Sequence, residues 1–122
     1  MKQTYETGLT GEKTAEEYLC GELDMICLER RYRNKCGEID LIMLDQDTVV
    51  FVEVKTRRNS APGEGLSAVN RTKQTRIARA AMIYLMQKKW IRRPVRFDLI
   101  EINRNEILHI PDAFQPGGQF YC

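Results

Sequence analysis

The stretch from Gly37 to Lys55 constrains the fold more than any other part of this chain, because both of its halves alternate between polar and apolar residues. Side chains in a strand point to opposite faces with a period of two. The first half places Glu38 and Asp40 on one face, and Ile39, Leu41 and Met43 on the other. The second half places Glu53 and Lys55 on one face, and Val50, Val52 and Val54 on the other. Both halves therefore predict strands that carry charged residues on one face.

A hairpin is predicted to join these strands, because Asp45, Gln46 and Asp47 lie between them and Asp is a turn-forming residue. Folding the hairpin gathers Asp40, Glu53 and Lys55 on one face. Two neighbouring carboxylates repel unless a proton or a cation sits between them, and oxygen ligands suit a hard ion such as Mg²⁺ or Mn²⁺. The lysine adds a positive charge where an oxyanion can develop. The alternative is a solvated sheet face with a Glu–Lys pair, but Val49 and Phe51 share the Glu53 face and favour partial burial.

The length of 122 residues suits one small domain, which we expect to span residues 1–122 with an irregular tail from about residue 111. A hydrophobic fraction of 43% is sufficient for a packed core. No apolar run is long enough to span a bilayer, and the N-terminal residues form no apolar signal segment. We therefore expect a cytoplasmic protein with no membrane partner. The four cysteines lack close paired spacing, which predicts reduced thiols rather than a zinc site.

The charge is unevenly distributed, although the formal net charge is only +2. Residues 1–64 hold thirteen of the seventeen acidic residues. Residues 65–97 hold no Asp or Glu and nine basic residues: Arg71, Lys73, Arg76, Arg79, Lys88, Lys89, Arg92, Arg93 and Arg96. Such a block predicts an anionic partner, with nucleic acid the first candidate. The alternative is a solvated basic helix, and charge alone does not separate the two.

Two helices are predicted to flank the strands. The first spans residues 8–23 with Thr10 as its N-cap, and one stripe of it carries Gly8, Glu12, Ala15 and Leu19, while Glu16 and Glu17 point toward solvent. A carboxylate on a buried stripe needs a partner; the alternative is that Glu12 lies in the first turn and complements the helix dipole. The second helix spans residues 66–89, with Ile77, Ala80 and Tyr84 on an apolar stripe that Lys73 interrupts.

Further strands are expected over residues 25–33, 95–102 and 107–110, and a loop over 57–65 is expected to flank the carboxylates. The order is then helix, three strands, helix and two strands. This order predicts an α/β fold, a three-layer α/β/α domain in which a mixed central sheet lies between helices.

The pattern of Asp40, twelve residues, then Glu53-Val-Lys55 resembles the core motif of the restriction-endonuclease-like PD-(D/E)XK superfamily. Over about Gly8 to Phe114 the chain is more closely similar to the small bacterial YraN family, which is grouped with Holliday-junction resolvase-like nucleases. The segments that carry this resemblance are Gly11-Glu12, Ala15, Leu19, Gly37-Glu-Ile-Asp40-Leu-Ile, Val50-Phe-Val-Glu53-Val-Lys55-Thr-Arg57, Lys73-Gln74 and Arg96-Phe-Asp98. The proline that precedes the superfamily's aspartate is Ile39 here.

The resemblance implies a role for each matching residue. Asp40 and Glu53 would be the principal ligands of Mg²⁺ or Mn²⁺, with the Val54 carbonyl as a third and Glu12 reaching the metal directly or through water. Lys55 would orient or activate the attacking water. Glu38, on the same strand face as Asp40, is a second-tier candidate. Expected nucleic-acid contacts come from the loop and the second helix: Arg57, Arg58, Arg71, Lys73, Gln74, Arg76 and Arg79.

Three functions remain open from the sequence. The first is a metal-dependent nuclease acting on DNA, including branched or junction DNA. The second is a nucleic-acid-binding module that keeps the fold without turnover. The third is an adaptor whose basic helix binds an acidic protein. The retained trio of Asp40, Glu53 and Lys55 favours the first over the second. The expected partner is nucleic acid, DNA in the first place, and a homodimer is left open.

Overall fold

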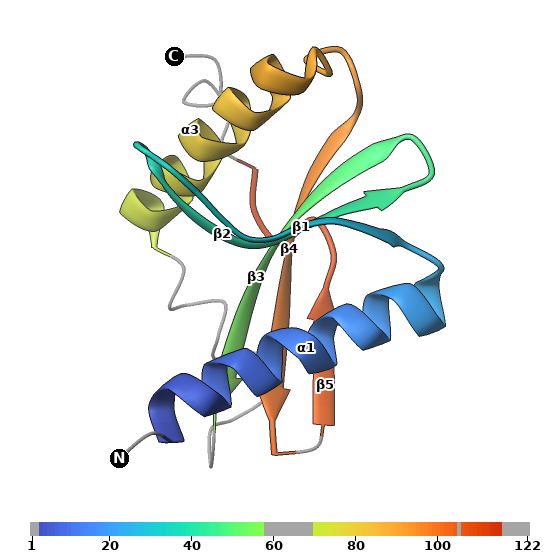
Figure 1. The fold of residues 1–122 in the computed structure, drawn as a ribbon, viewed down its shortest axis with the longest axis vertical. Coiled ribbons are helices and arrows are strands. Elements are labelled where there is room, and N and C mark those ends of the chain that lie inside the picture. The colour runs from blue at the N-terminus through green and yellow to red at the C-terminus, as the bar shows by residue number, and fades with distance from the viewer. Residues whose placement is uncertain (1–2, 58–69, 105, 116–122) are drawn as a thin grey trace.

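The computed structural model describes residues 3–57, 70–104 and 106–115. Its elements follow the predicted order (Figure 1): α1 (Gln3–Leu23), β1 (Ile26–Asn34), β2 (Gly37–Asp45), β3 (Thr48–Arg57), α3 (Arg71–Lys88), β4 (Val95–Asn103) and β5 (Glu106–Ile110). None of the helices in these described ranges is long and apolar enough to cross a membrane.

The five strands form one sheet in the order β1-β2-β3-β4-β5. Neighbouring strands are antiparallel except β3 and β4, which run parallel. Parallel neighbours need a crossover connection, and α3 lies in that connection. The predicted mixed sheet is therefore confirmed.

The two helices cover opposite faces of the sheet, as the alternating strand residues require. On one face α1 buries Ala15 and Leu19 against strand residues Leu41, Met43, Val50, Val52, Ile100 and Ile102. On the other face α3 packs its apolar stripe, including Ile77, Ala80 and Tyr84, against strand residues Ile42, Val49, Phe51, Phe97 and Leu99. Burial of these side chains on both faces is the main stabilising contribution. The structure confirms the three-layer α/β/α architecture.

The strands β2 and β3 diverge at one end, and this divergence creates a notch between them. Their pairing runs from Asp45↔Thr48 to Leu41↔Val52 and no further. Beyond it, residues 37–40 of β2 stay paired with β1, and residues 53–57 of β3 stay paired with β4. In Figure 1 the β1–β2 hairpin bends toward α3 while β3 continues past α1. The side chain of Asn34, at the hairpin end, donates to the Ala80 carbonyl of α3 over 3.1 Å.

Several predicted boundaries were wrong. Helix α1 begins at Gln3, so Thr10 lies inside it and is not its N-cap. Helix α3 begins at Arg71, because Asn70 is its N-cap with an extended backbone at φ −74° and ψ 175°. The turn between β2 and β3 is confined to residues 46 and 47, and Asp45 is the last residue of β2. Gln46 adopts a positive φ of 57°, which suits a tight turn.

The strict alternation predicted for β2 also fails at one point. Ile39 packs with Ile42 on the α3 side of the sheet, whereas Leu41 packs on the α1 side. Regular alternation would have placed Ile39 and Leu41 on the same side. The break falls at Asp40, the first residue of β2 beyond its pairing with β3.

A cluster of charged and polar groups around Asp98 fixes β5 to the sheet. The carboxylate of the fully buried Asp98 in β4 accepts hydrogen bonds from Arg96, from His109 of β5 over 2.8 Å, and from the backbone N–H of Asp112. Burial opposes ionisation, but the hydrogen bonds with His109, Arg96 and Asp112 lower the pKa of Asp98 on balance. Arg96 and Asp98 of the Arg96-Phe-Asp98 segment therefore have a structural role, which is to hold β5 against β4.

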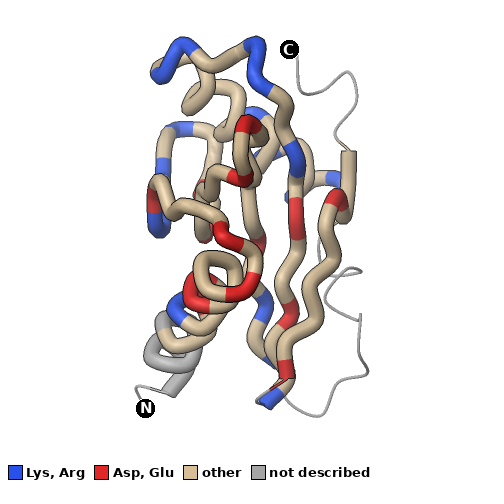
Figure 2. Tube along the Cα trace, turned by 90° about the vertical axis from the view of Figure 1, so that its right-hand side faces the viewer, with Lys and Arg blue, Asp and Glu red and all other residues tan. Residues whose placement is uncertain are grey.

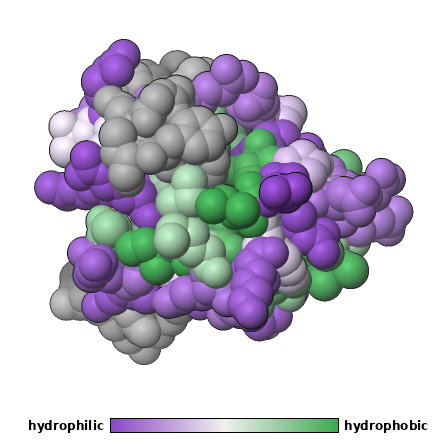
Figure 3. All heavy atoms as spheres, turned by 90° about the horizontal axis from the view of Figure 1, so that it is seen from above, coloured by the Kyte–Doolittle hydropathy of each residue, from purple (hydrophilic) through white to green (hydrophobic). Residues whose placement is uncertain are grey.

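The basic block is divided between two regions of the molecule. In Figure 2, Lys and Arg residues occupy the top of the molecule, where α3 ends, and acidic residues gather along α1. Arg71, Lys73 and Arg76 lie in the first turns of α3, whereas Lys88 and Lys89 lie at its end. At 1.5 Å per residue, the two ends of the helix at Arg71 and Lys88 are about 25 Å apart. Seen from above, the molecule also exposes apolar side chains in the middle of a hydrophilic surround (Figure 3), and Met86 and Ile91 near the end of α3 are both exposed.

Candidate active site

A cavity of about 620 Å³ opens at the notch between β2 and β3. All three layers contribute to it. Its lining residues are Glu12 from α1; Gly37, Glu38 and Asp40 from β2; Glu53, Val54 and Lys55 from β3; Asn70, the α3 N-cap; and Thr72, Lys73, Arg76 and Ile77 from α3. The structure thus places Glu12, Asp40, Glu53, Val54 and Lys55 around one cavity.

Asp40 lies where the two strands separate. Its Oδ2 accepts a hydrogen bond of 2.8 Å from the backbone N–H of Val54, in a position where the sheet ladder would otherwise continue. Burial and the nearby charge of Glu53 raise the pKa of Asp40 to about 8, against the lowering effect of the Val54 N–H. Below that pH, Asp40 therefore holds a proton next to Glu53.

Glu53 is buried, with only 7% of its surface exposed, and two ammonium groups meet at one of its oxygens. Nζ of Lys73 lies 2.7 Å from Oε2, and Nζ of Lys55 lies 3.2 Å from the same atom. Burial and the hydrogen bond with Lys73 lower the pKa of Lys55. Burial acts in the same direction on Lys73, but hydrogen bonds with Glu53 and Lys55 raise the pKa of Lys73 on balance.

The start of α3 explains why Lys73 reaches Glu53. The side chain of Asn70 accepts a hydrogen bond of 2.9 Å from the backbone N–H of Lys73, which fixes the first turn of the helix. Lys73 is then in that first turn, next to the cavity. The sequence-based prediction did not include Asn70, although an Asn immediately before a helical segment is a standard start signal. Thr72, which also lines the cavity, has no comparable signal.

Glu12 comes to the cavity from the middle of α1, so the helix-dipole interpretation was wrong. The neighbouring Gly11 is buried, and a Cβ there would collide with Oγ1 of Thr56 in β3. The absent side chain thus lets α1 approach β3 closely. The pKa of Glu12 is raised on balance, chiefly by burial. Arg31, 3.6 Å away, and a hydrogen bond with Asp40 act in the opposite direction. Glu16, predicted to face solvent, instead accepts two hydrogen bonds of 2.7 Å from Arg30.

Only some of the remaining predicted site residues line the cavity. Glu38 and Arg76 line the cavity, and Glu38 lies 3.6 Å from Arg33. Four others, Arg57, Arg71, Gln74 and Arg79, do not line it. Arg57 is the last residue of β3 and is half-buried. Its Nε atom is buried and has no hydrogen-bond partner in the described structure. Arg58 lies outside the described residues.

The carboxyl groups of Asp40 and Glu53 provide this cavity with oxygen donors of the kind that a hard divalent cation prefers. The Asp40 and Glu53 carboxylates share the cavity, and their repulsion is part of the reason that Asp40 retains a proton. A cation with oxygen ligands would replace that proton, with Val54 beside it as a carbonyl donor. Over residues 3–57, 70–104 and 106–115, however, no three side chains of His, Cys, Asp or Glu stand together as a metal site, and Glu12 is turned toward Arg31.

Comparison with known proteins identifies relatives over most of the chain. Residues 11–102 match the sequence profile described as "Uncharacterised protein family UPF0102". A UPF0102 protein of Geotalea uraniireducens is 45% identical over 88% of each chain. Another, of Geotalea daltonii, is 48% identical over 88% of this chain and 87% of the relative, and one of Clostridium kluyveri is 40% identical over 90% and 94%. The chain therefore belongs to Uncharacterised protein family UPF0102, the YraN family that its sequence resembles.

Proposed function

We propose that this protein is a metal-dependent nuclease that hydrolyses phosphodiester bonds of DNA. The observation that carries the proposal is the cavity at the β2–β3 notch, where Asp40 and Glu53 share the lining with the ammonium groups of Lys55 and Lys73, and which Glu12 also lines. Paired carboxylates that favour a cation, next to lysines that can face a phosphate, are the groups that phosphodiester hydrolysis requires.

Each group has a role in this proposal. Bound by Asp40 and Glu53, Mg²⁺ or Mn²⁺ would act as a Lewis acid that activates water and offsets charge on the phosphate. Lys55, whose pKa is lowered, would orient the attacking water and exchange a proton with it. Lys73 has a raised pKa and stays charged, which suits it to neutralise a non-bridging phosphate oxygen.

The DNA backbone would enter across the start of α3. Arg71, Arg76 and Arg79 are exposed on this helix, and Arg76 also lines the cavity. Within the described residues no carboxylate pairs with any of these three guanidinium groups, so they remain available to phosphates. Contacts of this kind bind DNA largely without reading its sequence.

A specific observation favours a second candidate function, binding of nucleic acid without cleavage. Glu53 is neutralised by two lysines, and Asp40 carries its own proton at neutral pH. Lysine ammonium groups therefore already offset the Glu53 charge, and the cavity could receive a phosphate through Lys73 and Arg76 alone.

One experiment separates the two candidates. Purified protein is incubated with single-stranded, duplex, flapped and four-way DNA in Mg²⁺, Mn²⁺ or EDTA, and both cleavage and gel-shift binding are measured. The nuclease proposal expects cleavage in Mn²⁺ or Mg²⁺, none in EDTA, and none with Asp40→Asn. Glu38→Gln is the matched control, because Glu38 lines the same cavity from the same strand but is exposed and paired with Arg33. Binding without cleavage of any DNA form would favour the second candidate.

A further inference from the structure

Arg31 has an unusual backbone for a strand residue. Six non-glycine residues of the described structure have a positive φ, and five of them lie in turns or at helix ends: Asp24, Gln46, Lys89, Arg104 and Asp112. Arg31, at φ 50°, is the sixth and lies inside β1. Residues with a side chain rarely adopt this conformation without a compensating contact, and such strain gathers at functional sites.

The register of the sheet places Arg31 directly across from Asp40. On either side of it, Arg30 pairs with Leu41 and Tyr32 pairs with Ile39, so Arg31 and Asp40 face each other between these two pairs. The alternation of β2 breaks at Asp40 as well. The two strands are therefore irregular at the same level, which is the level of the notch.

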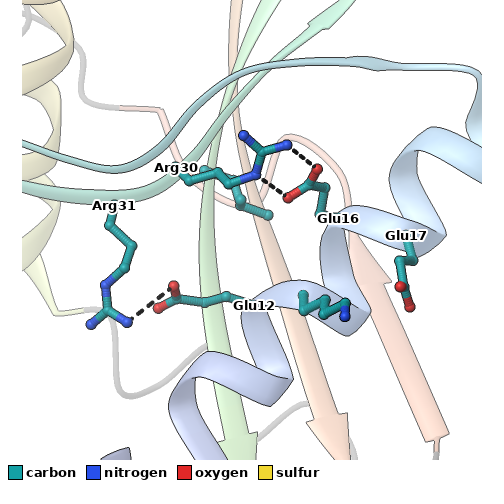
Figure 4. Close-up of a pocket in the computed structure, with 7 residues that line it drawn as sticks. Glu12, Glu16, Glu17, Arg30 and Arg31 are labelled. Atoms are coloured by element: carbon teal, nitrogen blue, oxygen red, sulfur yellow. Dashed lines mark hydrogen bonds and ion pairs between the residues drawn. The ribbon is translucent and has the colours of Figure 1, made fainter. Parts of the chain in front are cut away.

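The positive φ directs the Arg31 side chain toward α1. Arg30 reaches Glu16 of α1, and in a regular strand the next residue would point to the opposite face. Arg31 instead also reaches α1, with Nη1 3.6 Å from Oε1 of Glu12. Figure 4 shows both arginines extending toward glutamates one turn apart on the same helix. The next residue, Tyr32, packs on the α3 side.

Glu12 lines two separate hollows of the surface. It lines the site cavity, and it also lines a groove of about 460 Å³ between α1 and β1, to which Arg30 and Arg31 contribute. We propose that Arg31 is a positioning residue of the active site, which through its ion pair holds the Glu12 carboxylate at the boundary of the notch, level with Asp40. This inference rests on the proposed metal site and extends it to a residue that neither touches the cavity nor belongs to the recognised motif.

The Arg30–Glu16 pair supplies a matched control. It joins the same strand to the same helix, and its contacts are shorter than those of Arg31 with Glu12. If α1 merely needs an ion pair to dock on β1, Arg30→Gln should disturb the site at least as much as Arg31→Gln. If Arg31 acts on Glu12, only Arg31→Gln should disturb it.

The test measures Mn²⁺ affinity by isothermal titration calorimetry, together with thermal melts in EDTA. We expect Arg31→Gln to weaken Mn²⁺ binding about tenfold, as loss of a residue that orients a metal ligand does. Arg31→Lys should recover part of the affinity, and Arg30→Gln should bind Mn²⁺ like the parent. Arg31→Gly serves as a second variant, because glycine adopts the positive φ without strain. It should melt no lower than the parent in EDTA and yet bind Mn²⁺ about as weakly as Arg31→Gln.

A double-mutant cycle shows whether Arg31 acts through Glu12. In a Glu12→Gln background, Arg31→Gln should cause no further loss of Mn²⁺ affinity, because the pair is already broken. An equal loss in both backgrounds, or an equal loss for Arg30→Gln and Arg31→Gln, would overturn the inference while leaving the metal site in place. A parent protein that binds no Mn²⁺ would overturn the metal site itself and this inference with it.

Discussion

Nζ of Lys73, in the first turn of α3, lies 2.7 Å from Oε2 of Glu53 in β3. This ion pair connects the helix on one face of the sheet to a carboxylate that lines the cavity. The sequence had suggested that Lys73 contacts a nucleic-acid backbone, whereas in the structure it is the nearest cation to Glu53. Lysines therefore offset the charge of Glu53, and a metal held by this carboxylate would compete with Lys73 for the same oxygen.

If the proposed nuclease function holds, Glu53→Gln should abolish cleavage, because it removes a carboxylate proposed to hold the metal. Repulsion between Glu53 and Asp40 alone would predict a metal-free variant no less stable than the parent, but the two lysine contacts reverse this expectation. Loss of the carboxylate leaves Lys73 and Lys55 without their counter-ion. We expect a loss of about 1 kcal/mol at pH 6, because both ammonium groups keep some access to water. Urea unfolding in EDTA measures the stability.

The same variant should also lose most of its stabilisation by Mn²⁺, since a ligand that binds the native state stabilises it appreciably only when its concentration exceeds its Kd. Thermal melts with and without Mn²⁺ measure this difference. Glu38→Gln is the control, which should keep both cleavage and Mn²⁺ stabilisation. A Glu53→Gln variant that cleaves as fast as the parent would show that the site lies elsewhere.

Lys73→Met should raise the affinity for Mn²⁺ and lower the rate of DNA cleavage. Removing the ammonium frees Oε2 of Glu53 from its shortest contact, so Mn²⁺ should bind several-fold more tightly. Cleavage should fall by about 10²-fold, because a charged group facing the phosphate has gone. Calorimetry and a single-turnover cleavage assay measure the two effects.

Arg76→Gln is the control for Lys73→Met. It removes one positive charge from the same cavity but no contact with Glu53, because none of the described ion pairs joins Arg76 to that carboxylate. It should weaken DNA binding with little effect on Mn²⁺ affinity. If both variants tighten Mn²⁺ binding equally, the effect is general electrostatics and not release of Glu53.

The alternating pattern of β2 and β3 allowed the hairpin and the proximity of Asp40 and Glu53 to be predicted, because period-two burial is a local property of the sequence. Helical periodicity likewise located Ala15, Leu19, Ile77, Ala80 and Tyr84 in the core. The three-layer order followed from the succession of these elements.

What the sequence did not predict depends on tertiary contacts. The break in alternation at Asp40 arises because β2 leaves β3 there, and no residue pattern marks that divergence. The positive φ of Arg31 is equally unmarked, since arginine has no preference for it. The Lys73–Glu53 pair depends on the angle at which α3 begins, which the Asn70 cap sets. Each of these features depends on contacts with residues far away in the sequence, which a local residue pattern does not reveal.

The stability of the metal-free protein should fall as the pH rises from about 4 to about 8. Asp40 has its pKa raised to about 8 in the folded state, chiefly by burial and the charge of Glu53, while the unfolded value is near 4. The folded state therefore binds this proton more tightly, and the resulting stability is complete at low pH and is lost as pH approaches 8. Asp40→Asn should remove most of this dependence, because it cannot ionise.

Urea unfolding in EDTA at pH 5.0, 6.5 and 8.0 measures this effect. Asp45→Asn is the control, because Asp45 lies at the other end of the same strand and pairs with Arg96. The parent and the control should lose stability with pH in parallel, while Asp40→Asn stays nearly constant. A parent whose stability is unchanged or increases between pH 5 and pH 8 would contradict the raised pKa. Adding Mn²⁺ should reverse the trend in the parent, since a cation replaces the proton.

The position of the basic residues along α3 predicts which of them contact DNA. Changing Arg71, Arg76 and Arg79 to Ala should lower the slope of log K against log salt by about 0.9 for each phosphate that is no longer neutralised, so by up to about 3. The control removes three cations from the opposite end of the helix and the turn beyond it, Lys88, Lys89 and Arg92, and leaves the net charge equal to that of the first variant. If DNA crosses the cavity end of α3, the first variant flattens the salt dependence and the control does not. Equal slopes in the two variants would mean that net charge alone drives binding, and a change confined to the control would move the DNA to the far end of α3. Fluorescence anisotropy in EDTA, from 50 to 300 mM KCl, measures binding without cleavage and applies to either candidate function.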